Sequence, residues 1–485
     1  MEHLYGKLSG YAEGDIYPYH MPGHKRRSWG ELPEAMYRMD ITEIEDFDNL
    51  HQPEGILLKL QREAARLYGA EESHYLVNGS TCGILSAVSS AIPFGGHILM
   101  ARNCHKSAYH AAYLRHLKVS YLYSDCLAAY GIWDAVKPEQ VRRALEAAED
   151  IRAVLIVSPT YEGRIADVSE IAGIVHAKGI PLIVDEAHGA HLGLAEGFPK
   201  NSCQAGADLV IHSVHKTLPA LTQTALLHVN GDLVDRDRLR RFLRIYQSSS
   251  PSYLLMAGID NALEYVRRQG KTAFGQFLQR YEKMTEVLKG CRCLQILSGS
   301  RREQDVGKLV VSPGRSGITG KRLSDILLNE YHLQTEMSSK NFVLAMFTLN
   351  DGEEAYRRMT EALLEIDDRL SERNAGEIFS RGRTGYAAYQ GQDFTEDGKL
   401  ISLWKAWDME GEEVALESSI GKYAAEFVNL YPPGVPLLAP GERMTEGLYR
   451  EILEDLEAGL TVQGIRVEAG KERLPRGIFI KMIHA

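Results

Sequence analysis

A long alternation of strand-length apolar runs with helical segments, from about residue 56 to residue 230, constrains the fold of this chain most strongly. The segment 56–69 carries apolar residues at helical spacing and ends at Gly69, a typical helix stop. The runs that follow are mostly apolar throughout, as in strands that are buried on both faces. They read HYLV, HILMA, AVLIV, PLIVD, DLVIH and TALLHV. Helical segments lie between most of them, which predicts an α/β domain with a mainly parallel, doubly wound sheet.

The length of 485 residues predicts more than one domain. A helix over about 253–289, with a break at Gly270, is expected to link the large domain to a second one. The strands and helices that follow it indicate a small α+β layer. We therefore expect four parts: an N-terminal arm over 1–55, a major domain over 56–290, a small α+β domain over 291–373 and a C-terminal domain over 374–485.

Composition and charge exclude several classes of protein. Apolar residues make up 44% of the chain and charged residues 25%, which is a normal globular balance. The formal net charge of −10 argues against a nucleic-acid-binding protein. The N-terminal residues lack the apolar region of a signal peptide, and no apolar run reaches the length of a membrane span. Six scattered cysteines without a CxxC pair are expected to be reduced thiols of a cytoplasmic protein.

The stretch DEAHGAHLGL, at residues 185–194, contains the DEAH letters of a helicase box and a pair of histidines that could suggest a metal site. A helicase with a DEAH box needs a phosphate-binding loop, GxxxxGK[ST], before that box. The nearest candidate, GRSGITGKR, lies after it, with Arg315 in place of the first glycine and Arg322 in place of the hydroxyl residue. The sequence therefore argues against a helicase. A metal site is not expected either, because His188 and His191 lack a third clustered ligand.

Three polar groups follow strand ends and are expected to meet in one crevice. Asp185 ends the run PLIVD, and Lys216 follows the run DLVIH one βαβ step later. In open α/β sheets, ligands bind beyond the carboxyl ends of the strands. The segment 79–81 begins a helix after HYLV, where free N–H groups and the helix dipole favour an anion. A phosphate site, a buried acid and a lysine are the set that pyridoxal phosphate (PLP) requires.

With these residues and several further motifs, the chain resembles the Orn/Lys/Arg decarboxylases of the aspartate-aminotransferase fold, which is PLP fold type I. The resemblance is to the short form, without an N-terminal wing domain, and spans nearly the whole chain. It implies a PLP-binding large domain with smaller α+β domains towards the C-terminus. The motifs are HMPGHK, TEIEDFDNLHQPEG, NGSTCG, RNCHKS, SPTYEG, DEAHGAHLG, HSVHKTLPALTQTALLHV, SSSPSYLL and YPPGVPLLAPGE.

The resemblance implies catalytic roles for four residues. Lys216 would carry the cofactor as a Schiff base, and Asp185 would pair with the protonated pyridine nitrogen. His105 would stack on the ring face, and His188 would lie near the ring and its 3′ oxygen. Thr160, in the SPTYEG motif, would also lie close to the cofactor.

A further set of residues would bind the cofactor phosphate. In the family that the chain resembles, the SSSPSY turn serves the cofactor of the neighbouring subunit. This implies a homodimer, or a higher homo-oligomer, with shared active sites. The phosphate contacts expected within one chain are Gly79, Ser80, Thr81, Ser213 and His215, and Ser249 is expected to reach the partner's phosphate.

The resemblance implies decarboxylation of a basic amino acid, which is arginine or lysine and possibly ornithine. The products would be agmatine, cadaverine or putrescine with CO₂, so the chain would act in polyamine metabolism. The cationic tail of the substrate needs an acid, and Glu162, Asp46, Asp48 and Glu426 are candidates without a ranking. Two alternatives remain: a fold-type-I aminotransferase, and a cofactor-free regulatory relative, against which the intact cofactor residues argue.

Overall fold

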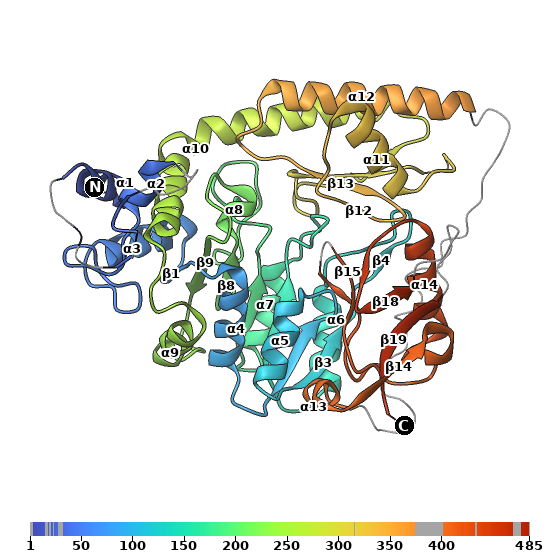
Figure 1. Cartoon of the computed structure of the whole chain (residues 1–485), viewed down its shortest axis with the longest axis horizontal. Helices are drawn as coiled ribbons and strands as arrows, with labels where there is room; N and C mark the ends of the chain where they lie inside the picture. The colour runs from blue at the N-terminus through green and yellow to red at the C-terminus, as the bar shows by residue number, and fades with distance from the viewer. Residues whose placement is uncertain are drawn as a thin grey trace.

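A computed structural model of the chain describes residues 3–14, 18, 21–22, 24–27, 33–314, 316–373, 401–431, 434–468 and 477–484 (Figure 1). Its centre is a seven-stranded sheet whose spatial order is β1-β9-β8-β7-β6-β2-β3. The strands are β1 (Glu72–Leu76), β2 (His97–Ala101), β3 (Lys118–Leu122), β6 (Ile151–Val157), β7 (Leu182–Asp185), β8 (Leu209–His212) and β9 (Ala225–Val229).

The sheet is mainly parallel, as the apolar runs predict. Strands β3, β2, β6, β7 and β8 pair in parallel, whereas β9 runs antiparallel to both of its neighbours, β8 and β1. Because β9 is antiparallel to both β8 and β1, strand β1 runs in the same direction as β8. The carboxyl ends of β1, β2, β6, β7 and β8 therefore lie at the same edge of the sheet, which is the edge where open α/β sheets bind ligands.

Helices cover both faces of this sheet. Helices α4, α5 and α9 pack beside one another, and α6 packs beside α7. Right-handed crossovers place α5 and α7 on opposite faces, because β2 to β3 and β6 to β7 step in opposite directions along the sheet. The helices are α4 (Gly79–Ala91), α5 (Lys106–Leu114), α6 (Pro138–Ala147), α7 (Val168–His176), α8 (Val214–Thr217) and α9 (Arg236–Tyr246), and a two-stranded ribbon of β4 (Cys126–Leu127) and β5 (Ile132–Trp133) precedes α6.

Two predictions at helix ends have opposite outcomes. Helix α3 (Ile56–Tyr68) ends at Gly69, which adopts a left-handed conformation with φ 71°, so this prediction is confirmed. The predicted break at Gly270 is wrong, because α10 (Tyr253–Leu288) continues through it. Gly270 is buried, and a Cβ there would lie 3.1 Å from Val266 Cγ1. This glycine provides space for packing and does not end the helix.

The N-terminal arm contains two helices. They are α1 (Leu4–Glu13) and α2 (Glu34–Met39), and α1 lies beside α10 (Figure 1). Leu4 and Leu8 are fully buried, and the backbone N–H of Leu4 donates to Asp260 of α10 at 2.9 Å. Helix α1 is thus held by contacts within its own chain.

The small domain is built on a four-stranded sheet of order β10-β11-β13-β12. Helix α10 runs from the N-terminal helices across the molecule and packs against the last helix of this domain (Figure 1). The elements are β10 (Gln295–Ile296), β11 (Lys308–Ser312), α11 (Gly320–Tyr331), β12 (Met337–Ser338), β13 (Val343–Met346) and α12 (Glu353–Arg373).

The C-terminal part contains two three-stranded sheets, of order β14-β19-β18 and β16-β15-β17. Residues 374–400, the prolines of the YPPG turn at 432 and 433, and part of the HMPGHK motif lie outside the described residues. Within the described part of the chain, no helix is long and apolar enough to cross a membrane. The elements are α13 (Leu403–Asp408), β14 (Gly411–Ala415), a 3-10 helix (Leu416–Ser419), β15 (Val428–Leu430), β16 (Pro436–Leu438), α14 (Glu446–Glu457), β17 (Val462–Gln463), β18 (Ile465–Glu468) and β19 (Gly477–Ile483).

Candidate active site

The predicted acid and lysine lie at the shared carboxyl edge of the large sheet. Asp185 is the last residue of β7, and Lys216 lies in α8, directly after β8. These two strands are parallel neighbours, so both side chains start from one edge. Asp185 is 7% exposed. Burial raises the pKa of its carboxyl, and the nearby Lys216 acts in the opposite direction. A cationic partner would therefore keep this acid ionised.

Lys216 belongs to a chain of three nitrogen groups. Its Nζ lies 2.9 Å from His188 Nε2, and the other ring nitrogen, Nδ1, lies 2.7 Å from Lys308 Nζ. Burial lowers the pKa of Lys216, while Asp185 and Glu336 raise it. The pKa of His188 lies well below its usual value because the ring is buried and both lysines are near it. The imidazole is therefore neutral, and the Lys216 amine loses its proton more readily than a surface lysine.

The predicted phosphate turn lies at the same edge. Gly79 begins α4 with φ 74°, so the turn needs a residue that tolerates the left-handed region. Ser80 Oγ lies 2.5 Å from Ser213 Oγ, which follows β8. The first N–H groups of a helix have no partner within the helix, and they favour an anion. Two hydroxyls and these N–H groups together form a donor set that suits a phosphate.

His105 is held where a stacking residue is expected. It caps α5, and its Nδ1 accepts from Ser107 N at 3.2 Å. Burial and then Lys216 lower the pKa of the ring to about 4, so the imidazole is neutral. A Cβ added to Gly434 would lie 3.3 Å from the His105 ring, and Lys106 N donates to the Gly434 carbonyl at 3.1 Å. The C-terminal part therefore lies directly against this histidine.

Thr160 and Glu162 line a small cavity of about 90 Å³ next to the site. Thr160 follows β6 and is buried, and its hydroxyl donates to Glu162 Oε2 at 3.1 Å. Burial raises the pKa of Glu162. The small domain contributes residues 339–342 to the cavity, and the C-terminal part contributes several more, including Asp455. All three parts of the molecule thus meet beside the predicted cofactor site.

Two predicted phosphate residues have other contacts within this chain. His215 Nδ1 donates to the Thr224 carbonyl at 2.8 Å, and no hydrogen bond joins His215 to the 79–81 turn among the described residues. Ser249 is exposed. Its neighbour Ser248 donates its N–H to Asn78 Oδ1 at 3.2 Å, so the SSSPSY turn borders the phosphate turn of its own chain. The predicted role of Ser249 towards a partner subunit stays a prediction.

Three residues near Lys216 carry no role in the sequence-based assignment. Lys308 reaches His188 from the small domain, and the Tyr161 ring packs edge-on against His188 with 4.7 Å between centroids. Tyr161 OH donates to Glu336 Oε1 at 2.5 Å. Glu336 is exposed, and its charge raises the pKa of Lys216. Tyr161 stands in the SPTYEG motif, but no sequence signal marks the other two residues.

The structure separates the four candidate acids for a substrate tail. Asp48 Oδ2 accepts the N–H groups of Gly55 and Leu57 at the start of α3, and Oδ1 accepts that of Glu54, so this acid is structural. Glu426 Oε1 accepts from Trp407 Nε1 and from the N–H of Phe427. Asp46 is exposed. Of these four acids, only Glu162 lines the cavity next to the site.

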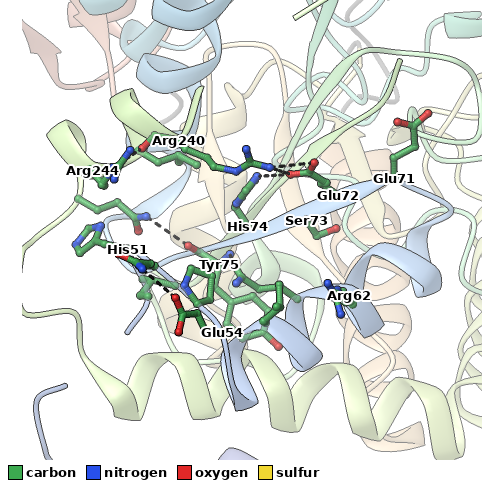
Figure 2. Close-up of a pocket in the computed structure, with 17 residues that line it drawn as sticks. His51, Glu54, Arg62, Glu71, Glu72, Ser73, His74, Tyr75, Arg240 and Arg244 are labelled. Carbon is green, nitrogen blue, oxygen red and sulfur yellow. Dashed lines mark hydrogen bonds and ion pairs between the residues drawn. The ribbon is translucent and has the colours of Figure 1, made fainter. Parts of the chain in front are cut away.

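The larger pocket, of about 520 Å³, lies elsewhere, between α3, β1 and α9 (Figure 2). Arg240 extends across it to Glu72, with 2.9 Å between Nη2 and Oε2 (Figure 2). None of the predicted site residues lines this pocket. Its size therefore does not make it the candidate active site, because Asp185, His188 and Lys216 converge elsewhere, after β7 and β8.

The donor set at the sheet edge suits PLP. A lysine amine, a buried acid, the histidine ring that caps α5 and a hydroxyl-lined helix start suit the aldehyde, the pyridine nitrogen, the ring face and the phosphate of the cofactor. Among the described residues, no three His, Cys, Asp or Glu side chains gather into a group that could hold a metal ion.

Comparisons with known proteins agree with the motifs. The profile described as "Orn/Lys/Arg decarboxylase, major domain" matches residues 3–303, and the profile of the C-terminal domain matches residues 403–459. An arginine decarboxylase of Bacillus subtilis is 30% identical, covering 95% of each chain. YaaO, an uncharacterized protein of the same organism, is 33% identical, also covering 95% of each chain.

Solved structures agree on the fold. A lysine decarboxylase of Francisella novicida superposes with a TM-score of 0.80 at 16% identity, covering 99% of this chain and 81% of that chain. A lysine decarboxylase of Pseudomonas aeruginosa gives 0.80 at 20% identity, covering 100% and 80%. A Sphingomonas wittichii serine palmitoyltransferase gives 0.53 at 15% identity, covering 64% and 76%. The predicted PLP fold type I is confirmed, and the chain belongs to the Orn/Lys/Arg decarboxylase family.

Proposed function

We propose that this protein is a PLP-dependent decarboxylase of a basic amino acid. The observation that carries the proposal is the half-buried Lys216 amine, 2.9 Å from the neutral His188 ring, at the sheet edge that also bears Asp185 and the phosphate turn. Membership of a decarboxylase family supports it, as does the 30% identity to an arginine decarboxylase over nearly the whole chain.

Each part of the cofactor has a candidate partner. Lys216 would hold it covalently, and Asp185 would pair with the pyridine nitrogen. Ser80, Ser213 and the N–H groups at the start of α4 would bind the phosphate, and His105 would stack on the ring. When bound, PLP supplies an electron sink for the electron pair that the departing carboxylate leaves on Cα.

The protein's own residues position the reacting groups and manage protons. Burial lowers the pKa of Lys216, so its amine loses a proton more readily and would then attack a carbonyl carbon. His188 orients that amine through its Nε2. After CO₂ leaves, Cα needs a proton, and Lys216 or a histidine near it would donate one. The small and C-terminal domains would exclude water from the site, because residues of both line the neighbouring cavity.

We propose arginine or lysine as the substrate and agmatine or cadaverine as the product. The cationic tail of either substrate needs an acid. Among the described residues, Glu162 lines the cavity next to the site and Glu336 acts on the pKa of Lys216, so these two are our candidates. Glu336 is the better candidate, because it is exposed, whereas burial favours the protonated form of Glu162. A Glu336→Gln variant should raise KM for the basic substrate with a smaller change in kcat.

We also propose a homodimer with shared sites, on the strength of the SSSPSY turn. The N-terminal arm gives this proposal no support, because its helix α1 packs on α10 of the same chain. The hydroxyls of the turn remain suited to a phosphate, and Ser249 is exposed and available to a second subunit.

The function is tested by identifying products after separate incubations with arginine, lysine and ornithine. We expect CO₂ and one equivalent of the matching amine from arginine or lysine. Borohydride reduction followed by peptide mapping should label Lys216. A keto acid without CO₂ would indicate an aminotransferase, and a colourless protein that binds no PLP would indicate a cofactor-free relative.

A further inference from the structure

A small cavity at the junction of the major domain, the small domain and the C-terminal part is lined by buried acids. It is the cavity of about 90 Å³ next to the candidate active site, and its lining includes Glu451 and Asp455 of α14. Glu451 is 8% exposed and Asp455 is 3% exposed. Acids are rarely buried to this extent unless they are paired. The partners of these two carboxyls therefore decide what the cavity can hold.

Lys340 of the small domain is the cation that these acids share. Its Nζ lies 2.8 Å from Glu451 Oε1 and 2.7 Å from Glu454 Oε2, but 3.9 Å from Asp455 Oδ1. Within the described part of the chain, no hydrogen bond reaches the Asp455 carboxyl, and Glu451 Oε2 is buried without a partner. Lys340 thus satisfies one oxygen of Glu451 and leaves most of the acceptor capacity of the two carboxyls open.

The charges around the cavity do not balance. Glu162, Glu451 and Asp455 line it with carboxyls, and Arg102 and Lys340 line it with cations. The Arg102 guanidinium is already engaged by another carboxylate of the C-terminal part in a bidentate ion pair. Burial, and then the neighbouring carboxylates of α14, raise the pKa of Asp455 to about 7, although Lys340 acts in the opposite direction. A second cation beside Asp455 would therefore stabilise its ionised form.

The remaining walls of the cavity suit an organic cation. Aromatic rings attract cations at their faces, and aliphatic side chains suit the methylene groups of an alkylamine. A hard metal ion is held instead by a shell of oxygen ligands. The volume lies well below the roughly 300–1,000 Å³ of pockets that enclose whole ligands, so the cavity has room for one end of a molecule. The aromatic residues are Trp133, Tyr161 and Phe342, and the aliphatic ones include Leu430, Val435 and Leu437.

We propose that this cavity binds the ammonium or guanidinium head group of a small organic cation, held by Asp455 and by Glu451 Oε2. Such a head group carries several N–H donors, and charge-assisted hydrogen bonds to carboxylates are the strong ones. Two sources supply this chemistry: the tail of a basic amino acid bound at the active site, and a free amine. The first source rests on the proposed function, whereas binding of the head group does not.

The first test measures binding without turnover. Full-length holoenzyme is titrated with methylguanidinium, which has no alkylamine that could react with an aldehyde, and binding is followed by saturation-transfer NMR and calorimetry. We expect saturable binding with a Kd on the order of 1 mM, and no binding of methylurea, a neutral molecule of the same shape. Asp455→Asn should weaken binding at least about tenfold, because it removes the open carboxylate. Glu457→Gln changes an exposed acid of the same helix and should have no effect.

A Lys340→Met variant should change the affinity in the opposite direction. It leaves Glu451 and Asp455 without their shared cation, so methylguanidinium should bind about tenfold more tightly. Damage to the cavity would weaken binding, so a gain of affinity cannot come from misfolding. The proposal is overturned if the wild type binds no methylguanidinium, which needs no variant, or if Asp455→Asn binds it as tightly as the wild type. Unchanged affinity of Lys340→Met would overturn it as well.

The second test identifies the source of the head group. If the substrate tail occupies the cavity, Asp455→Asn should raise KM about tenfold with little change in kcat, and methylguanidinium should compete with the substrate. If a free amine is the occupant, KM stays the same and inhibition by added agmatine or cadaverine is lost. A variant that changes neither would overturn the proposal. Methylguanidinium binding without CO₂ release would keep this site and remove the proposed function, and CO₂ release without methylguanidinium binding would do the reverse.

Discussion

The buried ion pair between Arg102 and Glu442 is expected to hold the C-terminal part against the major domain. The two side chains are 4% and 10% exposed. Arg102 Nε lies 3.0 Å from Oε1 and Nη2 lies 2.8 Å from Oε2, so the pair is bidentate. Arg102 also donates to the carbonyls of Pro436 and Leu437 in β16, at 2.7 and 3.2 Å. One guanidinium, directly after β2, thus anchors the strand that follows the YPPG turn.

Glu442→Ala should cost about 3–5 kcal/mol in the free energy of unfolding, because it leaves a buried guanidinium without its counter-ion. It also removes the acceptor of the Ala439 N–H, which lies 2.8 Å from Oε2. Glu413→Ala is the matched control in the same domain. Its partner is Arg466, and these side chains are 50% and 47% exposed, so the loss should stay within about 1 kcal/mol.

Urea unfolding followed by tryptophan fluorescence measures both variants, since Trp404 and Trp407 lie in α13 of the C-terminal part. The double variant Arg102→Met/Glu442→Leu should be more stable than Glu442→Ala, because it buries no charge. The reasoning is refuted if Glu442→Ala unfolds at the same urea concentration as Glu413→Ala. A double variant as unstable as the single one would instead assign the cost to packing.

Three further predictions concern the sheet edge. Asp185→Asn should fold and bind PLP but lower kcat for CO₂ release by about 10²–10³, and activity within threefold of wild type would give Asp185 another role. Burial raises the pKa of Glu186 from 4.5 to about 8, so its carboxyl is protonated in the folded state between these pH values. As pH rises from 4.5 to 8, the free energy of unfolding of the wild type should therefore fall relative to that of Glu186→Gln, by up to about 1.4 kcal/mol per pH unit. His212, whose pKa burial lowers to about 3, remains in both proteins, so its opposite contribution largely cancels in this comparison of urea midpoints. Mixing Lys216→Ala subunits with subunits disabled at 248–250 should restore activity if sites are shared, and verified subunit exchange without recovery would argue for self-contained sites.

The sequence by itself determined the large sheet and the edge at which the site lies. Short apolar runs separated by helices admit few arrangements, and parallel strands bring their carboxyl ends to one edge whatever the details of packing. Asp185, Lys216 and the 79–81 turn could therefore be assigned to one crevice from strand order alone. The helix over 253–288 was also predictable, but the role of Gly270 was not, because a glycine that makes room for packing reads in sequence like a break.

Only the tertiary structure decided which groups from other domains surround Lys216. Lys308 opens an apolar strand, and the sequence alone would treat such a lysine as a solvated strand end. Docking of the small sheet against the SPTYEG loop buries it beside His188. Glu336 and the Arg102–Glu442 pair likewise depend on how separate domains meet. Local patterns encode helices and strands, whereas contacts between domains depend on the packing of whole surfaces, which no short stretch of sequence contains.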